Sequence, residues 1–195
     1  MLELTEGKML YHGSYCEVQH PLLEKCAKHK DFGKGFYLTS SKSQAVKFLN
    51  ISIIKALSSG LIDDMQNYGY VSVFQVEDIE DLLVKAFRDA DQEWLHCVAA
   101  HRKRKLFPDI VKKMADYDIV VGKIADDATN ATLTAYLSGV FGEAGEEKTD
   151  EFCISRLLPN KLKDQYCFKT EKALKALRFV GCEKICMKKP YPRID

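Results

Sequence analysis

Apolar residues follow two different spacings along this chain, and together they predict a sheet with helices packed against it. Short segments in which apolar residues alternate or run together, bounded by glycine or polar residues, are typical of strands. Such segments span residues 8–12, 36–39, 70–76, 117–124, 165–170 and 182–188, and residues 82–87 are a plausible partner strand. The segment at 117–124 has the nearly continuous apolar character of a buried strand.

Longer segments carry the helical repeat, most clearly between Ser41 and Gly60. One apolar stripe there contains Ala45, Phe48, Leu49, Ile53 and Leu57. Ser40 or Ser41 is expected to cap this helix. Further helices are predicted at residues 18–29, with Pro21 in the first turn, and at 91–101, 130–140, 149–158 and 171–179. The pattern predicts an α+β fold with about six strands and a comparable amount of helix.

Length and composition fit one globular domain over residues 1–195. No repeat or linker interrupts the chain, and a chain of this length buries roughly two-thirds of its unfolded surface. A net charge of +1 gives no general attraction for nucleic acid or membranes. No apolar run approaches the ~18 residues of a membrane span or resembles a signal peptide, so no membrane association is expected.

The seven cysteines are scattered, odd in number and form no CxxC pair. This usage predicts reduced thiols in the cytoplasm and argues against a disulfide framework or a metal site. The basic run at residues 101–105 is expected to be the solvated end of a helix, with a phosphate-facing role as the less favoured alternative. Arg102 in this run is therefore expected to be a surface charge.

Two glycine-flanked loops carry the candidate chemistry. Tyr11–Ser14 (YHGS) and Asp31–Thr39 (DFGKGFYLT) each place an aromatic and a polar group beside a short strand. Glycine permits a ligand to approach the backbone closely. Taken alone, His12 is more typical of a histidine that hydrogen-bonds within the protein than of a ligand-binding one. Tyr37 alone is typical of a half-buried strand residue. Their order and spacing favour a cleft for a nucleotide with an aromatic base.

Three ordered motifs, at residues 12–14, 32–37 and 41–43, resemble the NAD-binding core of the ADP-ribosyltransferase superfamily. The resemblance is to the branch that contains the poly(ADP-ribose) polymerases and diphtheria toxin. Further blocks are similar to an uncharacterised bacterial group assigned to that superfamily; they comprise residues 31–39, 93–95 with Arg102, 117–127 and 165–174. The resemblance covers about residues 9–180. It implies a split, two-sheet α+β core with surrounding helices and NAD between the sheets.

The resemblance also implies roles for individual residues. His12 would bind the ribose hydroxyls of the adenosine half, and Tyr37 would stack on the nicotinamide ring. Gly13 would offer its backbone to the nicotinamide carboxamide, with the Ser43 hydroxyl as a second partner. Further contacts to NAD are expected from neighbours in the two loops, namely Tyr11, Ser14, Gly35 and Phe36.

The chain departs from the family pattern at Gln165, where the family usually has a catalytic glutamate. Gln165 can still hold a ribose hydroxyl as a catalytic-site residue, but it brings no charge. Asp126 and Asp127 are better placed than Asp164 to supply a carboxylate, although they could instead cap the following helix. A second stacking tyrosine of the family falls at Val46; Phe48 could replace it, or it could belong to the buried stripe.

The resemblance implies a mono-ADP-ribosyltransferase that moves ADP-ribose from NAD to a protein or nucleic-acid acceptor and releases nicotinamide. A toxin or defence factor is a plausible setting. NAD hydrolysis by water is a close variant of this chemistry. The alternative class is a module that binds NAD or ADP-ribose without turnover, which the neutral Gln165 favours. Polymer formation is not expected, because polymerising members use the glutamate.

Overall fold

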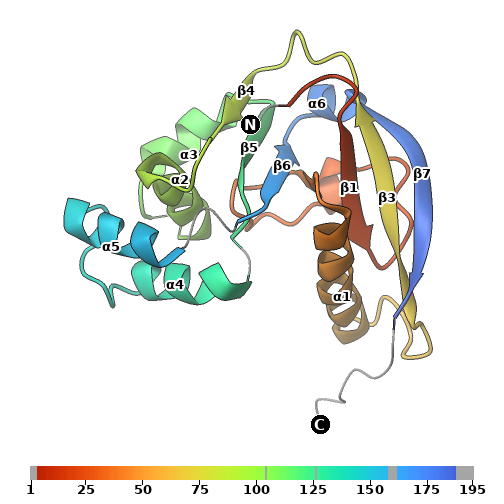
Figure 1. Cartoon of the computed structure of the whole chain (residues 1–195), viewed down its shortest axis with the longest axis horizontal. Coiled ribbons are helices and arrows are strands. Elements are labelled where there is room, and N and C mark those ends of the chain that lie inside the picture. The colour runs from red at the N-terminus through yellow and green to blue at the C-terminus, as the bar shows by residue number, and fades with distance from the viewer. Residues whose placement is uncertain (1–3, 104, 126, 158–161, 188–195) are drawn as a thin grey trace.

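The computed structural model describes residues 4–103, 105–125, 127–157 and 162–187 (Figure 1). The strands are β1 (Met9–Ser14), β2 (Phe36–Thr39), β3 (Tyr68–Val76), β4 (Val84–Ala86), β5 (Ile119–Lys123), β6 (Asp164–Phe168) and β7 (Leu177–Cys186). The helices are α1 (Lys42–Ser58), α2 (Gln92–Arg102), α3 (Pro108–Ala115), α4 (Asp127–Leu137), α5 (Glu147–Leu157) and α6 (Glu171–Lys175). A single 3-10 turn, η1 (Leu23–Lys25), lies between β1 and β2. The predicted α+β class is confirmed.

The strands form one mixed sheet with the order β4-β5-β6-β2-β1-β3-β7. Every residue of β1 pairs with β3, and every residue of β2 pairs with β6. Between β1 and β2, however, only Tyr11 and Thr39 are register partners. The sheet is therefore continuous but has a weak seam in its middle, where two sheets were expected. Figure 1 shows the halves on either side of this seam turned away from each other.

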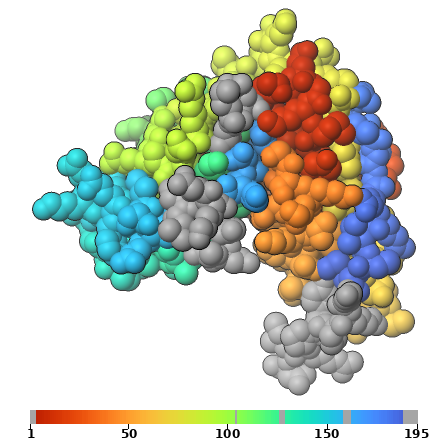
Figure 2. Space-filling view, in the orientation of Figure 1, coloured from red at the N-terminus to blue at the C-terminus, as the bar shows by residue number. Residues whose placement is uncertain are grey.

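Different helices cover the two halves (Figure 1). Ala45, Leu49 and Ile53 of α1 pack on Val71 of β3. On the other half, a larger core around Trp94 joins α2 to α5 with β5 and β6. A third cluster draws residues from β1, β2, β3, β5, β6 and α6, so it spans the seam and holds the halves together. Figure 2 shows α4 and α5 projecting to one side and the half with β3 and β7 to the other.

Gly13 allows α1 to lie directly against β1. A Cβ at this position would lie 2.0 Å from the carbonyl oxygen of Ala45. That obstacle is helix backbone, which cannot rotate away as a flexible side chain could. The glycine of the YHGS loop thus has a packing role, because it sets the position of α1 beside the seam.

Most predicted elements are confirmed, and Ser41 is the N-cap of α1, accepting a bond from the amide of Gln44. The helix predicted at 18–29 is wrong, because only η1 forms there. Pro21 lacks an amide hydrogen and disfavours helical geometry at the residue before it. Leu22, the residue after Pro21, is extended, and the amide of Val18 bonds to the Ser72 hydroxyl.

Two further boundaries differ from the predictions. The helix predicted at 171–179 ends at Lys175, and the chain enters β7 at Leu177, earlier than the strand predicted at 182–188. Phe179 packs edge-on against Phe74 across the β3–β7 pair, so tertiary contacts override the helical pattern. Helix α3 was not predicted, although Pro108 in its first turn is a helix-start signal.

No helix in the described ranges is long and apolar enough to cross a membrane.

A substitution at Gly13 tests the packing of α1. We expect Gly13→Ala to lower the free energy of unfolding by about 1–3 kcal/mol, because α1 must move away from β1. Gly181→Ala on β7 is the control, since a Cβ there meets nothing within 4 Å, and we expect a change within about 0.5 kcal/mol. Urea unfolding measures both. Equal stabilities for the two variants would contradict the close packing at Gly13.

Candidate functional site

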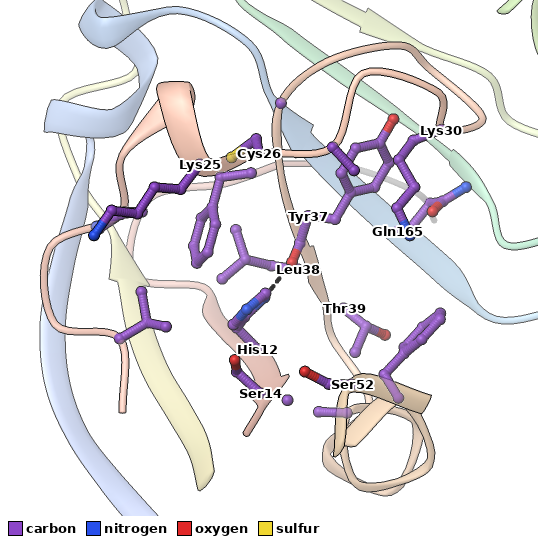
Figure 3. Close-up of a pocket in the computed structure, with 18 of the residues that line it drawn as sticks. His12, Ser14, Lys25, Cys26, Lys30, Tyr37, Leu38, Thr39, Ser52 and Gln165 are labelled. Atoms are coloured by element: carbon purple, nitrogen blue, oxygen red, sulfur yellow. Dashed lines mark hydrogen bonds between the residues drawn. The ribbon is translucent and has the colours of Figure 1, made fainter. Parts of the chain in front are cut away.

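A cleft of about 980 Å³ lies where β1 and β2 part. This volume is at the upper end of the ~300–1,000 Å³ typical of small-molecule and cofactor sites. Its wall comes from residues 11–22, from the loop before β2, from β2 itself, from one face of α1, and from Arg102, Ile124, Ala125 and Gln165. Figure 3 shows His12, Tyr37 and Gln165 around one opening, contributed by β1, β2 and β6.

His12 bridges the seam with its side chain. Its Nδ1 lies 2.8 Å from the backbone carbonyl oxygen of Tyr37 (Figure 3). A carbonyl oxygen can only accept, so Nδ1 carries the hydrogen, and Nε2 is left as an acceptor in the neutral ring. Burial lowers the pKa of His12; the bond to Tyr37 acts in the opposite direction, and Lys30 lowers the pKa further. His12 is therefore neutral near pH 7.

Tyr37 uses its hydroxyl to hold the preceding loop. The hydroxyl donates to the carbonyl of Gly33 at 2.8 Å and accepts from the amide of Phe32 at 2.9 Å. Burial raises the pKa of this hydroxyl well above its usual value. Because the hydroxyl is engaged inside the protein, the ring is the part of Tyr37 that remains for a ligand.

The same loop is anchored on its other side. Phe32 is fully buried in the core beside Gly122, where a Cβ would meet the Phe32 ring at 2.6 Å. Gly33 has φ +82° and lies against the ring of His101. These contacts fix the position of Asp31 at the cleft wall before any ligand binds.

Gln165 is 6% exposed, and its amide group is held by two acceptors. Nε2 donates to Asp31 Oδ2 and to the carbonyl of Lys123, each at 3.1 Å. Among the described residues, no hydrogen-bond partner is found for Oε1 of Gln165. The amide is thus oriented by its two N–H groups, and its oxygen is available to a ligand hydroxyl.

Asp31 links this amide to Arg102. Asp31 Oδ1 accepts from Nε and Nη2 of Arg102 at 2.9 and 2.7 Å. Nη1 of Arg102 donates to Asn130 at 2.8 Å. The side chains of Asp31 and Arg102 are 13% and 21% exposed, and both residues line the cleft. The prediction of Arg102 as a surface charge is therefore wrong, because the ion pair draws it into the cleft wall.

The structure brings most of the predicted site residues to one place. The cleft is lined by Tyr11, His12, Gly13, Ser14, Gly35, Phe36, Tyr37 and Gln165. Phe48 is half-buried and also lines it, so it belongs to the wall as well as to the helix stripe.

The other predicted residues lie elsewhere. Ser43 is exposed, outside the cleft lining, and its hydroxyl lies 2.9 Å from that of Ser41, because it occupies the solvent side of the first turn of α1. Ser52, further along α1, lines the cleft instead. Asp126 lies outside the described residues. Asp127 begins α4, and its side chain also lies outside the described part.

The sequence predicts no role for Asp31 and a surface position for Arg102. Asp31 directly precedes the buried Phe32, and Arg102 follows the buried Trp94 on the same helix. Trp94 Nε1 donates to the Lys123 carbonyl, which also accepts from Gln165. A charged residue at the start of a glycine loop was the available signal, but nothing in the sequence pairs it with a residue 71 positions away.

Positive charge predominates along the cleft wall. Lys25, Lys30, Lys55 and Arg102 line the cleft, whereas the acidic lining residues are Glu17 and Asp31. None of these three lysines forms an ion pair among the described residues. Partial burial lowers the pKa of Lys30; Lys55 lowers it further, Asp31 opposes this, and Arg102 again lowers it. The wall is therefore suited to an anionic ligand.

The model of the family described as "Protein of unknown function (DUF3990)" matches residues 8–179. The chain belongs to this family. The matched region includes both glycine loops, the cleft and Gln165. No curated protein matches the sequence.

Acidification tests the neutral state of His12. The folded pKa lies below the unfolded value of 6.5, so the unfolded chain binds the proton more readily. The stabilisation from neutral His12 is complete above pH 6.5 and is lost as the pH falls through the lower folded pKa. We expect wild-type protein to lose more unfolding free energy than His12→Asn below that pH, by at most about 1.4 kcal/mol per pH unit.

Urea unfolding at several pH values measures this difference. His101 also has a pKa lowered by burial, but it titrates in both proteins and cancels in the comparison. Identical pH dependences for wild type and His12→Asn would contradict a half-buried, neutral His12.

Proposed function

We propose that the cleft binds NAD and that the protein transfers the ADP-ribosyl group of NAD to an acceptor, releasing nicotinamide. The observation that carries the proposal is the convergence of His12, Tyr37 and Gln165, from three strands, on one cleft of suitable volume. In the superfamily that the motifs resemble, the positions matching these three residues belong to the NAD site. The corresponding finer fold proposal is an ADP-ribosyltransferase-like split core, with the β1–β2 seam as the split.

Each half of the dinucleotide has a chemically suitable partner in the cleft. Nε2 of neutral His12 can accept a hydrogen bond from a ribose hydroxyl of the adenosine half. The ring of Tyr37 can stack on the flat nicotinamide. Residues 12–14 have no register partner on β2, so this edge of β1 can bind the nicotinamide carboxamide through its backbone. Oε1 of Gln165 can accept from a hydroxyl of the nicotinamide ribose.

The diphosphate of NAD matches the charge of the wall. Lys30 and Lys55 approach the cleft from the loop and from α1, and neither is neutralised by an ion pair in the described part of the chain. Burial is the main cause of the lowered pKa of Lys30, and repulsion from Lys55 and Arg102 lowers it further. Two phosphate charges would offset this repulsion among the cations.

The reaction conserves electrons and charge. The bond between the ribose C1′ and the nicotinamide nitrogen breaks, and its electron pair leaves with neutral nicotinamide. The positive charge moves from the pyridinium ring to C1′ and the ring oxygen of the ribose. A lone pair of the acceptor then forms a bond to C1′, and the acceptor loses its proton to solvent. With a protein or nucleic-acid acceptor this is transfer, and with water it is hydrolysis.

A second candidate function is NAD binding without turnover. Gln165 favours it, because an amide gives less stabilisation to a developing positive charge than a carboxylate does. We place either function in the cytoplasm, since all seven cysteines are free thiols.

Release of nicotinamide by purified protein separates the two functions. We expect wild-type protein to release nicotinamide, and Tyr37→Ala to lose about tenfold or more of the rate, because the ring no longer holds the nicotinamide. Tyr37→Phe is the matched control: it keeps the ring, so it should retain release, although it loses the bonds to Phe32 and Gly33. Unchanged release by Tyr37→Ala would contradict the site. NAD binding by a wild-type protein without release would favour the second function.

The lysines allow an independent test of the diphosphate contact. We expect the double variant Lys30→Ala/Lys55→Ala to weaken NAD binding by about tenfold and to reduce its dependence on salt, because screened charge attraction is removed. Isothermal titration at low and high salt measures both effects. Lys47→Ala is the control, since Lys47 is exposed on the same helix but does not line the cleft. Equal affinities for all three proteins would contradict the proposed contact.

A further inference from the structure

The bond between Asp31 and Gln165 joins a carboxylate to a neutral amide at the cleft wall. Asp31 Oδ2 lies 3.1 Å from Gln165 Nε2, and both residues line the cleft. We propose that Asp31 is a positioning residue for the reaction: it fixes the Gln165 amide with its oxygen toward the ligand and supplies the negative charge that Gln165 lacks. This inference rests on the proposed transfer of ADP-ribose.

The hydrogen bonds at Nε2 fix the direction of the Gln165 amide. Both partners of Nε2, Asp31 Oδ2 and the Lys123 carbonyl, are oxygens that accept its hydrogen bonds. A rotated amide would place Oε1 against these two oxygens and leave the buried N–H groups without partners. The carboxylate therefore excludes the rotated amide, and Oε1 remains available to accept from a ribose hydroxyl.

Asp31 also places a negative charge next to the Gln165 amide. When the bond to nicotinamide breaks, positive charge develops on the ribose that Oε1 would contact. A carboxylate hydrogen-bonded to the N–H side of the amide increases the electron density on its oxygen, because linked hydrogen bonds polarise one another. Asp31 is mostly shielded from water, so its field is weakened less than that of an exposed group. The pair of Asp31 and Gln165 thus stabilises the developing positive charge through the amide.

Arg102 is the cation beside Asp31. Arg102 binds Oδ1, whereas Gln165 binds Oδ2, so the two oxygens have separate partners. Asn130 holds the free end of the guanidinium. Arg102 partly offsets the charge of Asp31, but its two hydrogen bonds also fix the carboxylate in orientation. The buried side chain of Phe32 anchors the loop, so Asp31 keeps its position when a ligand enters the cleft.

The alternative is that Asp31 only tethers its loop to α2 through Arg102. The two roles differ in what a neutral isostere would do. Asp31→Asn can keep an oxygen toward Arg102 but presents an N–H group to Gln165, so the Gln165 amide would rotate and withdraw Oε1 from the cleft. If Asp31 is only a tether, Asp31→Asn would weaken the attachment of the loop to α2. If Asp31 positions Gln165, the same variant would slow the chemical step.

The experiment compares four variants with wild type in a nicotinamide-release assay, with NAD affinity and melting temperature measured in parallel. We expect Asp31→Asn to lower kcat by about 100-fold, the size typical of losing one preorganised polar contact, while NAD affinity changes less than about threefold, since the charge matters mainly in the transition state. The double variant Asp31→Asn/Gln165→Glu exchanges the carboxylate and the amide between positions 31 and 165. The negative charge stays at the cleft wall, so this variant should recover most of the lost kcat. Gln165→Glu alone places two carboxylates together and should make release more dependent on pH.

Asp164→Asn is the matched control. Asp164 neighbours Gln165 on β6 and pairs with Lys123 at 2.9 Å, but it does not line the cleft, so release should be unchanged. Full release by Asp31→Asn would overturn this inference and leave the proposed function intact. If Asp31→Asn both slows release and lowers the melting temperature, and the double variant does not recover release, Asp31 only tethers its loop. That result would also overturn this inference. A wild-type protein that releases no nicotinamide would overturn both.

Discussion

The separation of β1 from β2 is the constraint on which the site depends. These strands share one register pair, Tyr11 with Thr39, and then part. Each strand is fully paired on its other side, and a shared core spans the seam, so the opening is held by the rest of the sheet. The hydrogen bond from His12 to the Tyr37 carbonyl takes the place of the missing backbone pairing. The cleft is thus a gap between two neighbouring strands of one continuous sheet, and the rest of that sheet holds the gap open.

The chemistry of the cleft follows from the need to satisfy buried polar groups. The Gln165 amide is almost completely buried, and a buried amide without partners would cost free energy. Asp31 and the Lys123 carbonyl meet that requirement for the N–H groups, and among the described residues the amide oxygen has no partner, so a ligand can use it. The Tyr37 hydroxyl likewise serves the loop, which leaves the ring for a ligand. In both residues, the internal hydrogen bonds determine which part of the side chain a ligand can use.

The sequence was most informative where structure depends on neighbouring residues. The stripe of α1 and its Ser41 cap were predictable, and the glycine loops identified His12 and Tyr37. Long-range contacts were not predictable from one chain. Asp31 meets Arg102 only because α2 packs beside the loop, and the helical pattern gave no reason to expect this. The helix predicted at 18–29 is wrong for a local reason. The prediction placed Pro21 in a first helical turn, whereas Leu22 is extended and only the short turn η1 follows it.

The central claim is that a dinucleotide occupies the gap between β1 and β2. A crystal structure of the protein with NAD tests this claim most directly. We predict density for NAD along the cleft, with the nicotinamide ring on Tyr37, a ribose hydroxyl at Nε2 of His12, and the second ribose within hydrogen-bond distance of Oε1 of Gln165. NAD bound on another surface, or a cleft that contains no NAD under saturating conditions, would contradict the account.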